Sequence, residues 1–314
     1  MKLTVPQQKS VERFQAIIRK KTISDRNGDI DREVFDSFLP MLREIYPDVF
    51  NVVESQLINE YGILIRWKGK NPALAPVVLM AHYDVVSDKD QNWTHPAFEA
   101  EIHNGVIWGR GSIDNKCIFT GILEGMEKLI LEGFTPERDI YFASSNCEEV
   151  AGDTMPKIVE WFKENNIEPW FVLDEGGAIM TSLPMGIKTP FAMVALSEKG
   201  WATVELTATA QTAAHSAKAG GSKVSAPVKL VRALDRLDKS PTPSTITPAL
   251  EGMLKAFAPN VDAPLKQVFN NINLLKRKAF CRFKKNIGLG FAFFYHISAD
   301  NSVKIFGKTS IFYL

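Results

Sequence analysis

The chain has 314 residues, a length that favours two domains of ordinary size, because single cores rarely exceed about 250 to 300 residues. Hydrophobic residues at 45% and charged residues at 23% exclude a disordered chain, a collagen-like repeat and a disulfide-rich mini-protein. The 37 basic and 36 acidic residues leave a net charge of +1, so no global field favours nucleic acid or a membrane surface as partner.

The N-terminal residues lack the apolar segment of a signal peptide, so we expect no secretion. The longest apolar run near the other end, residues 287–297, is far shorter than the about 20 residues of a membrane-spanning helix. Three widely spaced cysteines, Cys117, Cys147 and Cys281, suit reduced thiols better than a disulfide framework. We therefore expect a cytoplasmic protein without a membrane segment.

Helical spacing of apolar residues predicts two amphipathic helices, over residues 6–20 and 31–46. Short β-rich apolar runs follow, and helical period returns between some of them, over 116–132 and 153–165. The predicted strands cover residues 62–67, 76–86, 107–109, 139–145 and 170–173. Strands that alternate with helices predict an α/β fold with a mostly parallel sheet.

The alternation of strands and helices ends near Lys188. Residues 192–210 predict two strands around a Glu-Lys-Gly turn, and residues 224–238 predict a helix. This start favours a second domain of the α+β type. We accordingly divide the chain into the N-terminal part of a catalytic domain (1–187), a partial second domain (188–270) and a divergent tail (271–314). The tail contains a basic run, residues 276–285, and then an aromatic segment, and neither shows a clean period.

His82 and Asp84 follow an apolar stretch without alternation, which is typical of a strand buried on both faces. Residues two apart on a strand point to the same side, so these two side chains share one cleft. The carboxyl end of a parallel strand is where open α/β sheets bind their ligands. Asp84 could orient the ring of a metal-ligating His82, although a hydrogen-bonded core histidine is an equal alternative.

Acidic side chains follow three further elements. Asp114 comes after two glycines and before a helix, where a helix N-cap is the common role. Glu148 and Glu149 end another apolar strand, and such neighbours repel unless a cation or a proton intervenes, or unless they lie in a solvated loop. The pair formed by Asp174 and Glu175 ends a fourth strand.

These strand ends together place one imidazole and several carboxylates at one edge of one sheet. Such a donor set suits zinc, with manganese or cobalt as other candidates. A bridging carboxylate would serve two ions about 3.5 to 4 Å apart and leave a neighbouring glutamate free to deprotonate water. The sequence therefore predicts a metal-dependent hydrolytic site.

In order, the segments HYD (82–84), GRGSIDNK (109–116), CEEVAG (147–152) and LDEGG (173–177) resemble the M20 metallopeptidase family, and within it the carboxypeptidase S, aminoacylase and N-acyl-amino-acid hydrolase branch. The resemblance covers about residues 10–250. It implies a catalytic α/β domain with two zinc ions, and an inserted α+β lid domain that forms a homodimer. It also implies hydrolysis of the amide bond of N-acyl amino acids or short peptides.

The resemblance implies a role for each matching residue. His82 would hold one zinc ion, Asp114 would bridge both ions, and Asp84 would orient His82. Glu148 would act as general base, and Glu149 would be a zinc ligand.

Either Asp174 or Glu175 would supply the remaining ligand, and the sequence leaves this choice open. His215, in the segment TAAHSA, would reach the partner's active site and stabilise the oxyanion. Cys147 stands where many members of the family have aspartate, and the resemblance fades after about Pro264. The final strands and late histidine ligand of the family have no counterpart, with His296 as the one downstream histidine, so the chain resembles a truncated member.

Two alternatives to an active hydrolase follow. The first is a catalytically inactive remnant that binds metal or dimerises without turnover. The second assigns residues 276–285 and the aromatic segment after them to a membrane or nucleic-acid surface. A solvated tail explains that basic run better, so we expect no nucleic-acid or membrane partner.

Overall fold

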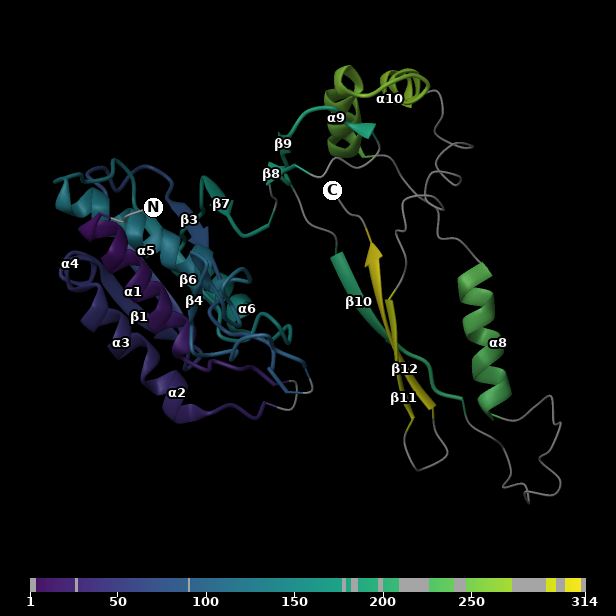
Figure 1. Cartoon of the computed structure of the whole chain (residues 1–314), viewed down its shortest axis with the longest axis horizontal. Coiled ribbons are helices and arrows are strands. Elements are labelled where there is room, and N and C mark those ends of the chain that lie inside the picture. Colours follow the sequence, from purple (N-terminus) through teal and green to yellow (C-terminus); the bar gives the residue numbers. More distant parts are fainter. Residues whose placement is uncertain are drawn as a thin grey trace. The chain divides into compact units, whose positions relative to one another are not determined.

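The computed structural model describes residues 4–25, 28–89, 91–176, 179–181, 186–196, 200–208, 226–239, 247–272, 292–297 and 303–311. The chain divides into two compact units, Met1–Glu175 and Gly176–Leu314, whose elements are labelled in Figure 1. The first unit contains all the predicted metal ligands, which are His82, Asp114, Glu149, Asp174 and Glu175. Each unit is described by itself.

A five-stranded sheet forms the centre of the first unit, in the order β1-β2-β6-β3-β7. The strands are β1 (Glu54–Ile58), β2 (Gly62–Trp67), β6 (Ile140–Ser144), β3 (Val77–Met80) and β7 (Phe171–Leu173). Strand β2 is antiparallel to both β1 and β6, while β3 is parallel to both β6 and β7. All strands except β2 therefore run in one direction, which confirms the prediction of a mostly parallel sheet.

The helices of the first unit are α1 (Val5–Arg19), α2 (Arg32–Asp36), α3 (Phe38–Ile45), α4 (Pro47–Phe50), α5 (Lys116–Leu131) and α6 (Thr154–Glu164). Helix α1 begins with a capping box, in which the Thr4 side chain and the Gln7 side chain each accept from the other's backbone N–H. The helix predicted over 31–46 is instead two helices that meet at Ser37. The hydroxyl of Ser37 donates to the Val34 carbonyl, a local bond that competes with a continuous helix.

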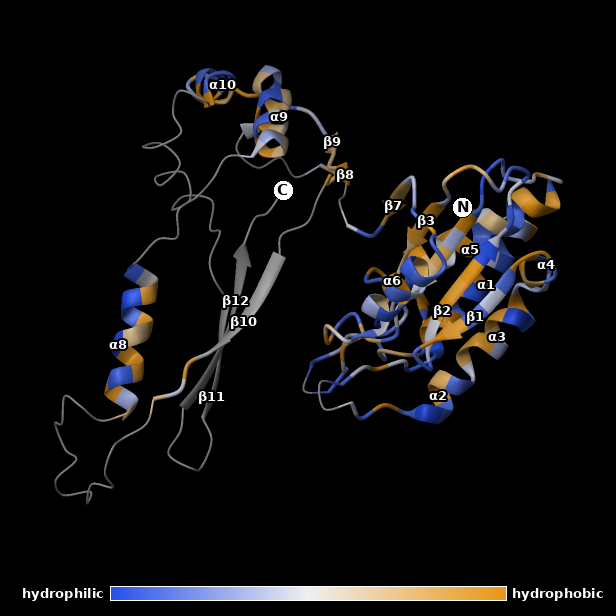
Figure 2. Ribbon diagram, turned by 180° about the vertical axis from the view of Figure 1, so that it is seen from behind, coloured by the Kyte–Doolittle hydropathy of each residue, from blue (hydrophilic) through white to orange (hydrophobic). Residues whose placement is uncertain are grey.

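Helices cover both faces of the sheet, because alternate residues of its central strands enter different cores. On one face, Ile63 and Ile65 of β2 and Phe142 of β6 pack with buried residues of α1, α2, α3 and α5. On the other face, Leu64 and Tyr141 pack with Ile158 and Phe162 of α6, among other residues. Figure 2 shows the apolar colour of β2 and β3 that this two-sided burial requires.

One part of the sheet prediction is wrong. Residues 107–109 do not join the central sheet, since β5 (Val106–Ile107) pairs with β4 (Ile102–His103) in a separate two-stranded ladder. The turn between them, Asn104-Gly105, has positive φ at both residues (54° and 79°), as in the type I′ turns that favour this dipeptide. Asp114 therefore reaches the site from a turn before α5 and not from the end of a central strand.

The second unit contains short strands and amphipathic helices. The elements are β8 (Ile179–Met180), β9 (Phe191–Ala192), β10 (Gly200–Glu205), α8 (Ala226–Lys239), α9 (Pro248–Phe257), η2 (Ala258–Asn260), α10 (Leu265–Asn270), β11 (Ala292–Ile297) and β12 (Val303–Ile311). Strand β12 lies between β10 and β11, antiparallel to both, so part of the divergent tail completes a sheet with the second unit. Helix α8 shows one apolar and one polar face in Figure 2.

Several sequence predictions concern residues that the structure does not describe. They include His215, Cys281 and the basic run 276–285. His296 lies in β11, opposite Lys304 of β12. Among the helices that are described, none combines the length and the apolar character needed to cross a bilayer.

Candidate metal centre

His82 and Asp84 lie in the extended segment that follows β3. Hydrogen bonds from the Tyr83 N–H to the Ser145 carbonyl (3.0 Å) and from the Val85 N–H to the Thr22 carbonyl (2.9 Å) hold this segment. The ring atom Nδ1 of His82 is 2.9 Å from the backbone oxygen of Asp84. Because a carbonyl oxygen only accepts, Nδ1 carries a hydrogen, and Nε2 lies on the other side of the ring, where it would bind a cation after losing its own proton.

Asp84 is fully buried and accepts three hydrogen bonds from two parts of the chain. Its carboxylate accepts from the Ser24 hydroxyl (2.6 Å) and from the backbone N–H groups of Glu148 (3.0 Å) and Glu149 (3.2 Å). The carboxylate is also 3.4 Å from Nδ1 of His82. Asp84 thus fixes the position of the imidazole and of the turn that carries the two glutamates.

Two backbone hydrogen bonds close the turn after β6. The N–H of Gly152 donates to the Cys147 carbonyl (2.8 Å), and that of Ala151 donates to the Glu148 carbonyl (2.8 Å). A Cβ atom at position 152 would lie 2.2 Å from Sγ of Cys147, so this turn requires glycine. The motif CEEVAG therefore determines the path of the backbone that presents Glu148 and Glu149.

Three carboxylates surround Nε2 of His82. The distances from Nε2 are 2.9 Å to Oδ1 of Asp114, 3.6 Å to Oε2 of Glu175 and 3.9 Å to Oε2 of Glu148. The imidazole is only 3% exposed, whereas the side chains of Asp114 and Glu148 are 67% and 53% exposed. The imidazole thus lies on the buried side of the cluster, and Asp114 and Glu148 lie on the open side that water and a substrate can reach.

In this crowded cluster the pKa values of His82 and of two glutamates are raised. Burial lowers the pKa of His82, but Asp84, Glu175 and Asp114 outweigh that effect and raise it to about 10. Burial, together with the charges of Asp114, Glu148 and Asp174, raises the pKa of Glu175 to about 7 against the opposing effect of His82. Burial and the charge of Asp114 also raise the pKa of Glu149. The cluster therefore needs positive charge, which protons supply when no cation is bound.

Lys116 holds the beginning of α5, two residues after Asp114. Its ammonium group is fully buried and donates to the carbonyls of Ile17 (3.0 Å) and Lys20 (2.6 Å) at the C-terminal end of α1. Burial lowers the pKa of Lys116 to about 7, against the opposing charge of Asp84. This contact fixes α5, and with it Asp114, against the first helix.

The donor set fits a divalent cation. Nε2 of His82 and one oxygen each of Asp114 and Glu175 lie within 4.8 Å of one another. Two ligands of a tetrahedral zinc ion, each at about 2.0 to 2.1 Å from it, are separated by roughly 3.3 Å, between the 2.9 Å and 3.6 Å that join His82 to these carboxylates. One imidazole with several carboxylates is a set that zinc and similar metals prefer.

The structure treats the predicted residues differently. It brings together five of them, which are His82, Asp84, Asp114, Glu148 and Glu175. The backbone N–H of Glu149 donates to Asp84. Asp174 is exposed, and Glu175 is the member of that pair in the cluster. Sequence reasoning missed Ser24, which reaches Asp84 because Ile23 forms a bridge with Val85. Nothing in the local sequence around Ser24 indicates this contact.

Comparison with known proteins identifies the family. The model of peptidase family M20/M25/M40 matches residues 78–271, which includes all the segments of the cluster. The chain belongs to this family. The resemblance found in the sequence is thereby confirmed.

Two curated relatives and one solved structure define the similarity further. The chain is 32% identical over 241 residues to N-fatty-acyl-amino acid synthase/hydrolase PM20D1.1 of Danio rerio, covering 76% of this chain and 46% of that protein. It is 37% identical over 201 residues to probable carboxypeptidase S-like 2 of Dictyostelium discoideum, covering 60% of this chain and 38% of that protein. The chain spans about half or less of the length of these relatives.

The fold matches the M20 family metallo-carboxypeptidase Sso-CP2 from Sulfolobus solfataricus with a TM-score of 0.57 and 18% sequence identity. The match covers 98% of this chain and 70% of that one. At this identity the similarity concerns the fold, and it confirms the α/β architecture.

Proposed function

We propose that the chain is a metal-dependent hydrolase that cleaves the amide bond of N-acyl amino acids or short peptides. The observation that carries the proposal is that the carboxylates of Asp114, Glu148 and Glu175 converge on the buried imidazole of His82. The names of the relatives, an N-fatty-acyl-amino acid synthase/hydrolase and a probable carboxypeptidase, support this substrate class.

We assign the metal ligands from the same geometry. His82, Asp114 and Glu175 would hold one ion, and Glu149, whose pKa burial and the charge of Asp114 raise, would with Asp114 hold another. Zinc suits this set, and manganese or cobalt are alternatives. When bound, such ions supply Lewis acidity that polarises the amide carbonyl and makes water more acidic. We favour Glu175 over the exposed Asp174 as ligand.

Glu148 has the position of a general base. Its carboxylate is 3.9 Å from Nε2 of His82 and is 53% exposed, so it lies beside the ligands and remains open to water and substrate. In the proposed reaction Glu148 takes a proton from the attacking water and passes it to the amide nitrogen as the C–N bond breaks. The products are a carboxylic acid and an amine.

Asp84 has a positioning role. It holds the backbone N–H groups of both glutamates and faces the protonated nitrogen of His82. Hydrogen bonds of this kind keep the lone pair of Nε2 directed at the metal.

The remaining expectations extend this proposal. His215 from a partner subunit would stabilise the oxyanion, and residues 188–270 would form the lid and dimer contact of a cytoplasmic homodimer. Residues 1–187 would contribute the metal-binding part, and residues 271–314 would be a divergent tail. The alternative is an inactive remnant that binds metal or dimerises without turnover.

Hydrolysis by the Glu148→Gln variant tests the proposal. Loss of the base should lower kcat by at least about 10²-fold, the usual contribution of general base catalysis. Bound zinc, measured after dialysis, should be unchanged, and the exposed Glu164→Gln on α6 serves as matched control. Release of amino acid from N-acyl amino acids by the unmodified chain, abolished by a chelator and restored by zinc, supports the hydrolase. A folded, zinc-loaded chain without turnover supports the inactive remnant.

A further inference from the structure

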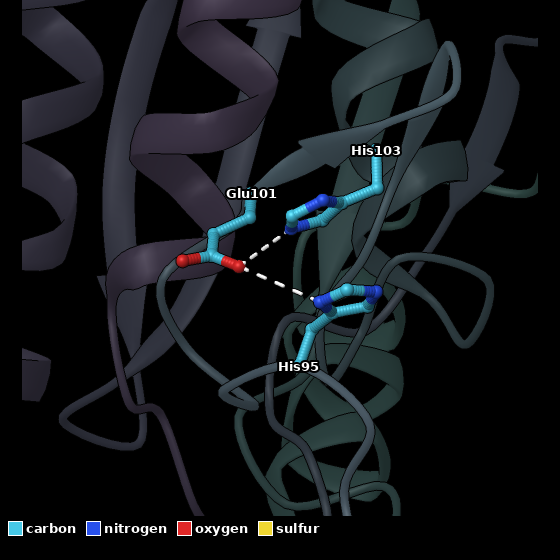
Figure 3. A group of neighbouring side chains, drawn as sticks. All are labelled: His95, Glu101 and His103. Atoms are coloured by element: carbon cyan, nitrogen blue, oxygen red, sulfur yellow. Dashed lines mark hydrogen bonds and ion pairs between the residues drawn. The ribbon is translucent and has the colours of Figure 1, made fainter.

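We propose that His95, Glu101 and His103 form a second metal site, separate from the His82 cluster. Figure 3 shows both imidazoles directed at one carboxylate oxygen of Glu101. Oε2 of Glu101 is 2.7 Å from Nε2 of His103 and 3.6 Å from Nδ1 of His95. The donor atoms of the three residues lie within 4.8 Å of one another.

Local structure explains why these residues meet. Glu101 directly precedes β4, and His103 is the last residue of β4. The two residues are two apart in extended chain, so their side chains point to the same face of the β4–β5 hairpin. The hairpin is closed by its Asn104-Gly105 turn, and the Trp108 N–H donates to the Glu101 carbonyl (2.9 Å). The hairpin thus presents an acid and an imidazole at fixed spacing.

His95 comes from the loop that precedes the hairpin. Its ring stacks on that of His103, with centroids 3.7 Å apart and an interplanar angle of 13°. The rings of Trp108 and His95 form a T-shaped contact, with centroids 4.8 Å apart. These two aromatic contacts keep His95 beside His103. Because the nitrogen lone pairs lie in the ring planes, one of the two stacked rings would turn when both bind the same ion.

The spacing and chemistry of the donors suit zinc. The distances of 2.7 Å and 3.6 Å lie on either side of the roughly 3.3 Å expected between two ligands of a tetrahedral zinc ion. Two imidazoles and one carboxylate are ligands that zinc, nickel and cobalt share. The side chains of His95 and Glu101 are 22% and 42% exposed, so a water molecule can complete the coordination.

Binding at this site would replace a hydrogen bond by metal coordination. Nε2 of His103 now donates to Glu101, since a carboxylate accepts, and this proton would leave when the ion binds. The ion would link the hairpin to the loop that carries His95. It would therefore stabilise this part of the first unit without contributing a ligand to the His82 cluster.

Zinc titration of the full chain tests the proposal. The His82→Asn variant weakens the main cluster, and it is compared with the double variant His82→Asn/His103→Gln by equilibrium dialysis against zinc chloride. We expect the double variant to bind one equivalent of zinc less, and zinc to raise the Tm of the single variant more than that of the double variant. The proposal is overturned if both variants bind equal amounts of zinc.

Matched substitutions near the hairpin separate coordination from general charge effects. Glu101→Gln removes a proposed ligand, whereas Glu99→Gln removes an exposed acid two residues away. In the His82→Asn background, loss of one zinc equivalent with Glu101→Gln but not with Glu99→Gln supports the site. Equal loss with both substitutions contradicts it. Far-UV circular dichroism checks that each variant is folded, and the double variant His82→Asn/His95→Asn replaces any that is not.

Discussion

At the residue scale, the position of the proposed centre depends on Asp84. Its carboxylate is the acceptor for Ser24 and for the backbone of both glutamates, and it has no exposed surface. If an asparagine replaced Asp84, its NH₂ group would face one of these hydrogen-bond donors, and that donor would lose its acceptor.

We expect Asp84→Asn to weaken zinc binding by about 10- to 100-fold, as is usual when the partner of a metal-ligating histidine is changed. Competition with a chromophoric chelator measures this affinity. Ser24→Ala removes only one of the three donors to Asp84 and should have a smaller effect. Wild-type affinity in a folded Asp84→Asn variant would show that Asp84 does not position His82.

Zinc binding should also depend on pH. In the metal-free cluster the pKa of Glu175 is raised to about 7 and that of His82 to about 10. Zinc must displace their protons, so its affinity should rise between about pH 6 and about pH 8, while fewer protons are released because Glu175 ionises by itself. Calorimetry in buffers of different ionisation enthalpy counts these protons. A proton count that is constant over this range, or that is unchanged in Glu175→Gln, would contradict the assignment.

Sequence reasoning at this scale identified the residue types but not every contact. The motifs around His82, Asp114, Glu148 and Glu175 are local, and each lies in the described cluster. The choice between Asp174 and Glu175 depends on the direction of the chain after β7, which no spacing encodes. Ser24 reaches Asp84 through a bridge between residues 23 and 85, a contact that is distant in the sequence.

At the element scale, the contact between α1 and α5 positions Asp114. Arg13 of α1 is buried and pairs with Glu127 of α5, with Nη2 2.6 Å from Oε1, and its guanidinium also lies 4.3 Å from the ring centre of Tyr46. Glu124, one turn before Glu127, is 3.2 Å from Nη1 of Arg13. These ion pairs link the two helices whose ends meet at Lys116.

We expect Arg13→Met to lower the free energy of unfolding by about 3 to 5 kcal/mol, because it leaves Glu127 buried without its partner. Arg32→Met is the control, since the ion pair between Arg32 and Glu60 is exposed on both sides and contributes at most about 1 kcal/mol. Urea denaturation of the two variants gives both values. Equal losses of stability would show that the α1–α5 ion pairs do not hold the unit together.

Element boundaries were predicted where local patterns are strong. The predicted helix 116–132 corresponds to α5, and the predicted strand 62–67 corresponds to β2. Strand β1 was missed because its burial does not alternate cleanly, and the β4–β5 ladder was placed in the wrong sheet because pairing partners are set by tertiary contacts.

At the scale of the whole molecule, the chain combines a sheet with helices on both faces and a second unit whose own sheet includes part of the tail. The pairing of β12 with β10 joins segments about a hundred residues apart, so the composition of the tail did not indicate it. The proposed activity depends on the first unit, where the cluster lies.

Anomalous diffraction at the zinc absorption edge, from crystals of the full chain grown with zinc chloride, tests the central claim most directly. The account predicts a peak bounded by Nε2 of His82 and by carboxylate oxygens of Asp114 and Glu175. A folded chain with these side chains in place, but without anomalous density between them at saturating zinc, would contradict it.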